Sequence, residues 1–293
     1  MLFHVVHTTG YHYVDTAMEA YLEVRLTPPV RAEQEIVRHR IEFLPAAQVS
    51  DYLDYFGNQT TFYSMTLRHR QLKVTNRLTV RTRPRVLPEV GLSLSVAEAR
   101  QILKTAGTGV FDYLQPTEAI PSASESTAWA REILRENCPL RECLEALNAT
   151  IHREFKYRSG STEIETPLSH IWKTREGVCQ DFAHVMLGIL RAAHLPCRYV
   201  CGYIESEPAV PAHPAQRPLV GSLATHAWVE VLVPGMAWVA LDPTNNQWCG
   251  EQHITVAVGR DFLDAAPVRG TFKGSASQKL KARVSMQRIP EKL

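Results

Sequence analysis

Apolar and polar residues alternate along the first third of the chain with a period of two, which is the spacing of a strand with one buried face. The apolar positions of this pattern are Leu22, Val24, Leu26, Val37, Ile41, Phe43, Tyr63, Met65 and Leu67. The alternation continues through residues 61–83, which predicts a hairpin, and Pro84 ends it because proline cannot donate to a strand ladder. We therefore expect an antiparallel β-domain over residues 1–83.

A linker and then helices follow this domain. Residues 84–124 are rich in Pro, Ser and Thr, but Ser95 is followed three residues later by Glu98, the capping-box pattern that opens a short helix. From about residue 125 the apolar spacing changes to three and four, most clearly over residues 140–155, which predicts two successive helices. The change of period marks a second domain, which we expect over residues 125–293.

The second domain contains one long apolar helix followed by strands. Apolar residues from Gln180 to His194 follow a helical stripe that Pro196 closes. The strand candidates after it are residues 198–205, 225–233, 237–242, 253–258 and 281–288, with a Pro-rich loop at 208–218 and a turn at Pro234-Gly235. A helix followed by antiparallel strands favours an α+β core over repeated βαβ units.

The composition is that of a folded protein without a strong charge bias. The chain has 293 residues, of which 45% are hydrophobic, and its formal net charge is +2, which gives no reason to expect nucleic-acid binding. No apolar run approaches the roughly 18 residues of a membrane span, and the N-terminus lacks the basic region of a secretory signal. We expect a cytoplasmic protein with no nucleic-acid or membrane partner.

The six cysteines are too few for a disulfide scaffold, and none of them has the C-x-x-C spacing of a zinc site. We therefore expect reduced thiols and no metal. Buried free cysteine is a common small hydrophobic residue, which is the expectation for Cys138, Cys143, Cys197, Cys201 and Cys249. Only Cys179 has a context that points to chemistry.

Cys179 stands at the predicted start of the long helix. There the unpaired N–H groups and the helix dipole favour a thiolate, the form in which cysteine is a nucleophile. Gly177 lets the chain turn sharply into the helix, whose apolar residues anchor it beneath the site. His184 lies about 140° around the helix from Cys179, so we expect a packing or hydrogen-bonding role for it.

His226 and Asp242 are the candidate partners of this thiol. A thiolate at neutral pH needs an imidazolium neighbour that can return the proton to the leaving group. His226 lies in one predicted strand and Asp242 ends the next, and the short turn between the strands predicts a hairpin that brings them together. We expect the carboxylate at Nδ1 of the imidazole, where it would fix the tautomer. The residues therefore predict a Cys-His-Asp triad.

Three blocks of the sequence, in the same order, resemble the transglutaminase-like cysteine protease superfamily. They are Gly177-Val178-Cys179-Gln180-Asp181-Phe182-Ala183-His184, Thr225-His226-Ala227-Trp228-Val229-Glu230 and Leu241-Asp242-Pro243-Thr244. The strand Arg198-Tyr199-Val200-Cys201-Gly202-Tyr203 is also similar, with Cys201 in place of a small residue such as Ser. The β-rich first third, with residues 54–58 in it, resembles the bacterial transglutaminase N-terminal region, and residues 259–264 and 267–270 are similar to the C-terminal portion of the same bacterial subgroup. The resemblance covers nearly the whole chain.

The resemblance implies a papain-like α+β core in which Cys179, His226 and Asp242 form the catalytic triad and no cofactor takes part. It also implies that an acyl group of a peptide or protein substrate passes through a thioester. We favour hydrolysis, because the bacterial members are usually interpreted as cysteine proteases. Transfer to an amine is the alternative, and a non-catalytic peptide-binding module on the same fold is a third hypothesis.

Two roles stay open at this point. The backbone N–H of Cys179 supplies one donor to the oxyanion of the reaction, and Trp172 is a candidate for the second. The β-domain of residues 1–83 either recruits a large substrate or is needed for folding. Nothing in the sequence indicates whether the protein is a monomer or an oligomer.

Overall fold

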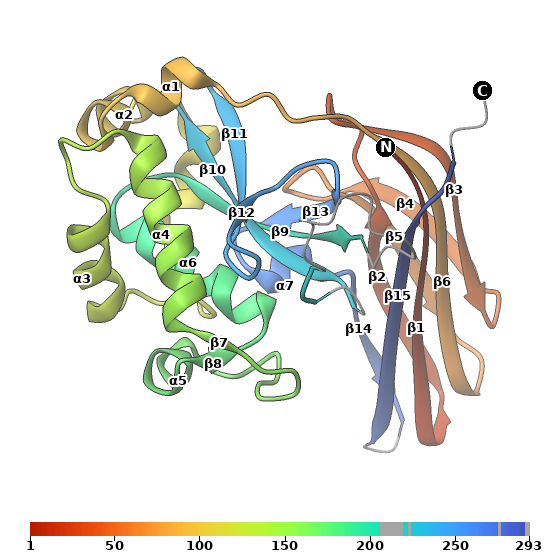
Figure 1. The fold of residues 1–293 in the computed structure, drawn as a ribbon. Coiled ribbons are helices and arrows are strands. Elements are labelled where there is room, and N and C mark those ends of the chain that lie inside the picture. The colour runs from red at the N-terminus through yellow and green to blue at the C-terminus, as the bar shows by residue number, and fades with distance from the viewer. Residues whose placement is uncertain (206–218, 222–223, 275–276, 291–293) are drawn as a thin grey trace.

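The computed structural model describes residues 1–205, 219–221, 224–274 and 277–290; the Pro-rich loop predicted at 208–218 lies outside these ranges. Figure 1 shows two halves side by side. The β half combines the strands of the first third of the chain with its last two strands, and the helical half contains the helices and a five-stranded sheet. The predicted α+β class, with an antiparallel β-domain ahead of a helix-and-strand core, is confirmed.

The elements have the following bounds. The strands of the β half are β1 (Leu2–Ala17), β2 (Glu19–Thr27), β3 (Gln34–Leu44), β4 (Gln48–Leu53), β5 (Gln59–Met65), β6 (His69–Thr82), β14 (Val268–Lys273) and β15 (Gln278–Arg288). Those of the helical half are β7 (Lys156–Tyr157), β8 (Glu176–Gly177), β9 (Cys197–Ile204), β10 (His226–Val233), β11 (Ala237–Asp242), β12 (Gln247–Trp248) and β13 (His253–Gly259). The helices are α1 (Glu89–Ser93), α2 (Val96–Leu103), the 3-10 helix η1 (Thr108–Leu114), α3 (Ser124–Ile133), α4 (Leu140–Glu154), α5 (Leu168–Thr174), α6 (Cys179–Ala192) and α7 (Phe262–Ala265).

Two four-stranded antiparallel sheets form the β half, in the orders β15-β1-β6-β3 and β14-β2-β5-β4. Alternate side chains of β1 are buried from Phe3 to Tyr13, as a strand with one face against a second sheet requires. The last two strands, β14 and β15, pair with β2 and β1. The beginning and the end of the chain therefore form one structural unit.

The hairpin predicted over residues 61–83 is wrong, although both of its strands exist as β5 and β6. β5 pairs with β2 and β4, whereas β6 pairs with β1 and β3 in the other sheet. Tyr63 of β5 meets Leu72 and Val74 of β6 in the apolar cluster between the sheets. Period-two alternation reports that one face of a strand is buried, but it does not report which strand lies alongside.

The helix α6 is the centre of the helical half. It packs against β9 and β10 of the five-stranded sheet, whose order is β12-β11-β10-β9-β13, and α3, α4 and α5 pack against it. All residues from Asp181 to Arg191 are buried. The predicted capping box of Ser95 and Glu98 and the hairpin of β10 and β11 are confirmed.

Side-chain amides of the β half cover the outer edge of β13, the last strand of the five-stranded sheet. Asn58 donates from Nδ2 to the Val258 carbonyl and accepts the Val258 N–H at Oδ1, both at 2.8 Å. Gln34 makes the same two bonds with Thr255, both at 2.9 Å. Both amides are buried. They complete the hydrogen bonds that an edge strand leaves open.

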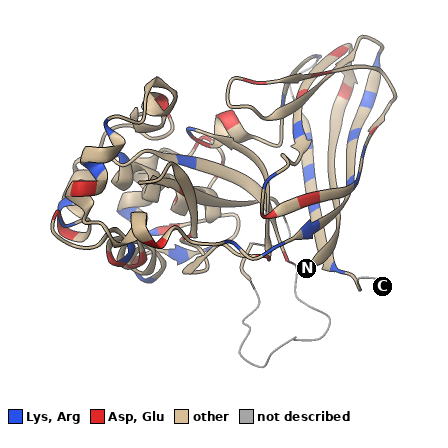
Figure 2. Cartoon of the chain, turned by 90° about the horizontal axis from the view of Figure 1, so that it is seen from above, with Lys and Arg blue, Asp and Glu red and all other residues tan. Residues whose placement is uncertain are grey.

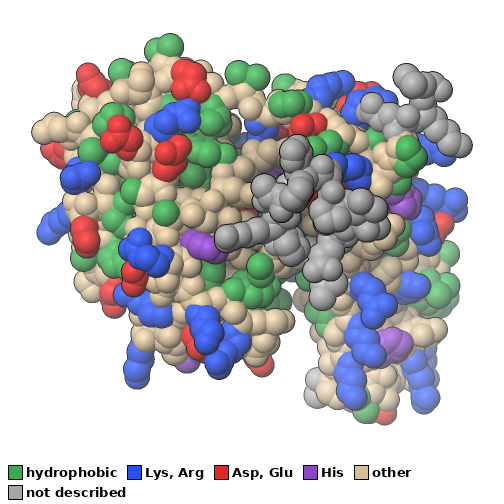
Figure 3. Space-filling model, viewed as in Figure 1, with side chains coloured by type: hydrophobic (Ala, Val, Ile, Leu, Met, Phe, Trp, Pro, Cys, Tyr) green, Lys and Arg blue, Asp and Glu red, His purple; other side chains and the backbone are tan. Residues whose placement is uncertain are grey.

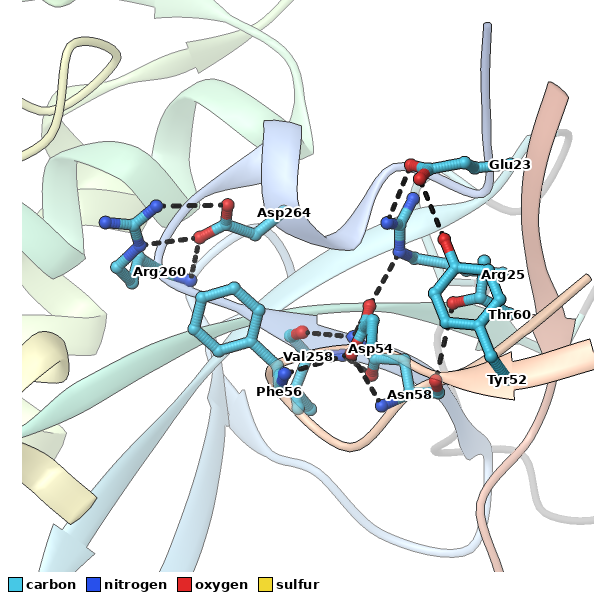
Figure 4. A network of polar contacts seen from close by, with 10 residues as sticks. All are labelled: Glu23, Arg25, Tyr52, Asp54, Phe56, Asn58, Thr60, Val258, Arg260 and Asp264. Atoms are coloured by element: carbon cyan, nitrogen blue, oxygen red, sulfur yellow. Dashed lines mark hydrogen bonds and ion pairs between the residues drawn. The ribbon is translucent and has the colours of Figure 1, made fainter. Parts of the chain in front are cut away.

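The turn that carries Asn58 is held by Asp54 (Figure 4). Asp54 Oδ1 accepts the N–H groups of Phe56 and Asn58, and Oδ2 accepts from Arg25 Nε at 2.8 Å. Gly57 has a φ of 78°, in the left-handed region that a glycine enters at little cost. The predicted tight turn at 54–58 is therefore confirmed, and it docks the β half onto β13.

A buried ion cluster and a shared apolar cluster also join the two halves. Glu230 on β10 is fully buried and lies 2.5 Å from Arg31 Nη1 and 2.6 Å from Arg198 Nη2. Burial raises the pKa of Glu230, but the arginines outweigh burial and lower it to about 2. Phe3 of β1 and Ile254 of β13 belong to one apolar cluster. The halves thus share a core.

The surface carries both signs of charge on both halves (Figure 2), in line with the net charge of +2. In the space-filling view the lower ends of the two halves stand apart and leave a notch between them (Figure 3). Within the described ranges, no helix combines the length and the apolar character needed to cross a membrane.

Candidate active site

Cys179 is the first residue of α6 and lines a cavity of about 690 Å³. Only 9% of the residue is exposed. The N–H groups in the first turn of a helix have no intrahelical partner, and the helix dipole adds partial positive charge there. Because α6 is buried along its length, the thiol stands on a rigid element.

The start of α6 is fixed by the side chain of Asp181. Its Oδ2 accepts the Val178 N–H at 2.8 Å and the Thr162 hydroxyl at 2.7 Å. A Cβ on Gly177 would lie 2.7 Å from this oxygen, so only glycine fits there. The φ of Gly177 lies outside the left-handed region, and it is the close approach of Asp181 that demands glycine at this position.

His226 and Asp242 meet across neighbouring strands. His226 opens β10, Asp242 ends β11, and His226 Nε2 lies 2.8 Å from Asp242 Oδ2. Both side chains are fully buried. The expected contact at Nδ1 is wrong. The register pairs Val229 with Leu241, which places Asp242 diagonally from His226, and the far nitrogen of the ring spans that distance.

The charges of the site favour an imidazolium beside a carboxylate. Burial lowers the pKa of His226, but Asp242 and Cys179 outweigh burial and raise it to about 10. Burial raises the pKa of Asp242, yet His226 holds it far below its usual range. In the described part of the chain His226 Nδ1 has no geometric hydrogen-bond partner, although Cys179 is close enough to act on the ring. This nitrogen is therefore left for the thiol.

Asp242 has more partners than the sequence indicated. The N–H groups of Thr244 and Asn245 bind its Oδ1 at 2.9 and 3.1 Å. Asn245 Nδ2 and His253 Nε2 lie 2.7 and 3.3 Å from its Oδ2. The sequence analysis identified neither Asn245 nor His253. The turn chemistry after Asp242 could have suggested Asn245, whereas no local pattern marks His253.

Aromatic and small side chains line the cavity around the thiol. Its described lining residues are Tyr157, Ser159, Val178, Cys179, Gln180, Tyr199, Leu219, Gly221, Ala224, Thr225, His226, Ala227 and Phe262. None of them is Asp, Glu, Lys or Arg. The cavity therefore suits an uncharged group next to the Cys179 thiol.

Tyr157 is a cavity residue that the sequence analysis did not find. Burial and the nearby Cys179 raise its pKa to about 12. A Cβ built on Gly221 would lie 3.6 Å from the Tyr157 hydroxyl and 2.8 Å from His226 Nδ1. The hydroxyl thus lies on the side of the cavity where the thiol and the imidazole face each other.

Trp172 and His184 lie elsewhere. Trp172 packs against Trp129 and Phe155, with the Arg175 guanidinium over all three rings, and it is not among the described residues that line the cavity. It is therefore a poor second oxyanion donor. His184 accepts the Phe262 N–H at 3.2 Å, and burial lowers its pKa to about 4. The hydrogen-bonding role expected for His184 is confirmed.

The fold and the site define the class of protein. A cysteine at a helix N-terminus beside a histidine and an aspartate on adjacent strands is the arrangement of papain-like thiol enzymes. In the described residues, no group of three or more His, Cys, Asp or Glu side chains could hold a metal ion. The chain belongs to the transglutaminase-like superfamily, whose family model matches residues 127–243, and a second model, the bacterial transglutaminase-like N-terminal region, matches residues 3–81. The predicted family is confirmed.

Relatives extend over the whole chain or over its core. An uncharacterised protein of Mycobacterium leprae is 32% identical over 289 residues, which cover 97% of this chain and 98% of that protein. The crystal structure of a proposed cysteine protease from Cytophaga hutchinsonii has a TM-score of 0.77 at 20% identity, covers 100% of this chain and 92% of its own, and shows the shared fold. The protein-glutamine gamma-glutamyltransferase of Pseudomonas aeruginosa is 32% identical over 108 residues, 34% of this chain and 16% of that protein.

Proposed function

We propose that this protein is a cysteine-dependent hydrolase of amide bonds, a peptidase or amidase that works through a thioester. The observation that carries the proposal is the 2.8 Å contact of His226 with Asp242 beside the cavity that Cys179 lines. A thiol, a base and a group that orients the base are the three parts that nucleophilic amide cleavage needs.

The first half of the reaction forms the thioester. The Cys179 thiolate attacks the carbonyl carbon of the amide, and the π electrons of the C–O bond move to the oxygen. The backbone N–H of Cys179 donates to this oxyanion, and we assign the Tyr157 hydroxyl as the second donor. His226 then gives its proton to the leaving nitrogen as the C–N bond breaks.

The second half releases the acyl group. Neutral His226 takes a proton from water as that water attacks the thioester carbonyl. The tetrahedral intermediate collapses, Cys179 leaves as thiolate, and the acid is released with His226 again protonated. Asp242 stays ionised throughout, holds the ring and stabilises the imidazolium.

Transfer of the acyl group to an amine is the second candidate function. The 32% identity to the gamma-glutamyltransferase of Pseudomonas aeruginosa, over 108 residues of the core, favours it. Against it, the described lining of the cavity offers no Asp or Glu to hold a cationic amine next to the thioester. We place hydrolysis first for this reason.

An acyl-enzyme trap tests the proposal. The protein is mixed with a peptide library, quenched with acid and analysed by mass spectrometry, with Cys179→Ala as the blank. We expect a thioester adduct on Cys179 and none in the blank. An adduct-free Cys179 under conditions that cleave no peptide would contradict the proposal.

A competition experiment between water and an amine then identifies the acceptor of the acyl group. The trapped donor peptide is incubated with the protein in the presence of an alkylamine, and the acid and amide products are quantified. Hydrolysis predicts that the acid predominates and that its rate is insensitive to the amine. An amide product that replaces the acid as the amine concentration rises would make the protein an acyltransferase.

A further inference from the structure

A second histidine contacts the same carboxylate oxygen of Asp242 as His226 does. His253 Nε2 lies 3.3 Å from Asp242 Oδ2, the same oxygen that His226 Nε2 contacts at 2.8 Å. His253 is the first residue of β13 and only 2% of it is exposed. One oxygen thus lies between two imidazoles that come from different strands.

The hydrogen bond at Nδ1 of His253 determines that the ring proton is on Nε2, the nitrogen that faces Asp242. The Gly250 N–H points to His253 Nδ1 at 3.4 Å, so Nδ1 acts as acceptor. A neutral imidazole with an accepting Nδ1 carries its proton on Nε2 and donates from there. Burial lowers the pKa of His253, with further lowering by His226 and Arg85 and opposition from Asp242. His253 is therefore a neutral donor to the carboxylate.

The strand that carries His253 is anchored from outside the catalytic core. Two residues along β13, the amide of Gln34 closes two hydrogen bonds with Thr255. The His253 ring packs edge-on against Trp228, with ring centroids 5.3 Å apart. His253 does not line the cavity. Its direct contact with the candidate triad is the one with Asp242 Oδ2.

We propose that His253 is a positioning residue: its Nε2–H holds the Asp242 carboxylate in the orientation that directs His226 at the thiol. This inference rests on the proposed function. The backbone N–H groups of Thr244 and Asn245 hold Oδ1 of this carboxylate, whereas Oδ2, which contacts His226, is shared with Asn245 Nδ2 and His253 Nε2. Loss of the His253 donor lets Oδ2 shift, and a base that is misplaced by this shift loses rate without losing substrate binding. Through Gln34 and β13, the docking of the β half then also supports the catalytic carboxylate.

Three variants separate positioning from packing. His253→Leu keeps the size of the side chain but removes the donor, and His253→Gln restores an N–H of similar reach. His7→Leu is the matched control, because His7 is also buried and hydrogen-bonded, at 3.0 Å to the Tyr203 hydroxyl, but in the β half. The readouts are kcat and KM for the release of p-nitrophenol from p-nitrophenyl acetate, and the downfield NMR resonance of the proton between His226 and Asp242.

Positioning predicts a specific pattern. His253→Leu lowers kcat by about tenfold to a hundredfold, the loss expected for a hydrogen bond to a charged group, with little change in KM, and it moves the downfield resonance. His253→Gln restores most of kcat. His7→Leu lowers the unfolding temperature but leaves kcat and the resonance unchanged. If His253→Leu does not fold, His253→Asn replaces it, since its shorter side chain cannot reach Asp242 Oδ2.

Two results overturn the inference. One is a His253→Leu protein with wild-type kcat and an unmoved resonance. The other is a His253→Gln protein as impaired as His253→Leu, since a donor then does not matter. Cys179→Ala is measured alongside: if it still turns over the ester, the proposed function fails, whereas an inactive Cys179→Ala with an unaffected His253→Leu rejects only the role of His253.

Discussion

At the scale of single residues, the hydroxyl of Tyr157 lines the cavity, which the linear sequence did not indicate. Tyr157 lies in the two-residue strand β7, just after α4. Its hydroxyl lies near the edge of the His226 ring that bears Nδ1. Tyr199 also lines the cavity but is almost fully buried, with 2% exposed. Of the two phenols, Tyr157 is better placed to donate to an oxyanion formed at Cys179.

Replacing Tyr157 by Phe tests this assignment. We expect kcat for p-nitrophenyl acetate to fall by about a hundredfold with little change in KM, because an oxyanion donor acts mainly in the transition state. Tyr199→Phe is the matched variant, and its effect is expected to be much smaller. A large loss in Tyr199→Phe with an unaffected Tyr157→Phe would transfer the role to Tyr199.

Gly177 gives a prediction on stability. A Cβ at this position would lie 2.7 Å from Asp181 Oδ2 and 2.8 Å from Asp181 Cβ. We expect Gly177→Ala to lower the free energy of unfolding by about 1–3 kcal/mol, because this overpacking displaces the side chain that fixes the start of α6. Gly109→Ala is the control, since no heavy atom lies within 4 Å of its Cβ. Urea unfolding of both variants measures the difference; equal stabilities would refute it.

The three candidate catalytic residues were predictable because each stands where an element begins or ends. Cys179 opens a helix, His226 opens a strand and Asp242 closes one, and such boundaries leave signals in the sequence. Tyr157 and His253 reach the site through tertiary packing alone. Nothing in their own neighbourhoods distinguishes them from residues of an ordinary core.

At the scale of elements, the edge of β13 is closed by side chains instead of a strand. Asn58 and Gln34 each supply one donor and one acceptor to the backbone of β13. The amide groups copy the hydrogen bonding of a neighbouring strand at two points. The five-stranded sheet therefore ends without exposing a pairing edge at these positions.

Asn58→Ala tests the contribution of this docking. The change leaves the N–H and carbonyl of Val258 without their partner in a buried place, so we expect the free energy of unfolding to fall by about 1–3 kcal/mol. Gln71→Ala serves as control, because Gln71 is exposed on β6. Chemical denaturation of the two variants is compared, and a loss no greater than that of Gln71→Ala would contradict the docking role.

Strands and helices were predicted better than their arrangement. The helical stripe of α6 and the hairpin of β10 and β11 follow from local spacing and a short turn. The separation of β5 and β6 into two sheets does not, because it depends on where strands from both ends of the chain pair. Long-range pairing of β15 with β1 has no local signal.

At the scale of the whole molecule, the two halves share a core, which argues against an independent recruiting domain. Phe3 and Ile254, from opposite halves, lie in one apolar cluster, and Glu230 is paired with Arg31 across the junction. The β half thus contributes directly to the stability of the sheet that holds the site. We expect the β half to be needed for folding.

Buried histidines give a prediction on stability and pH. Burial lowers the pKa of His7 and of His184 to about 4 from 6.5, so the unfolded chain binds more protons than the folded one between these values. Stability therefore falls as the pH drops from about 6.5 to about 4. His226, with its pKa raised to about 10, acts oppositely, and its contribution is lost as the pH rises from about 6.5 to about 10.

Urea unfolding as a function of pH measures both limbs. We expect the free energy of unfolding to be greatest near pH 6.5, with His7→Gln flattening the acid limb and His226→Gln flattening the alkaline limb. A wild-type protein whose stability increases steadily from pH 6.5 to 9, or an alkaline limb unchanged in His226→Gln, would contradict the assigned charge states.

The central claim, a thiolate and imidazolium pair at Cys179 and His226, is tested most directly by the rate of alkylation with iodoacetamide as a function of pH. Cys138 is the internal reference, since it is partly exposed and Cys179 is buried, so exposure alone would favour Cys138. We expect Cys179 to react much faster than Cys138 at neutral pH, and His226→Gln to abolish this advantage. A Cys179 that reacts no faster than Cys138 and is indifferent to His226→Gln would contradict the account.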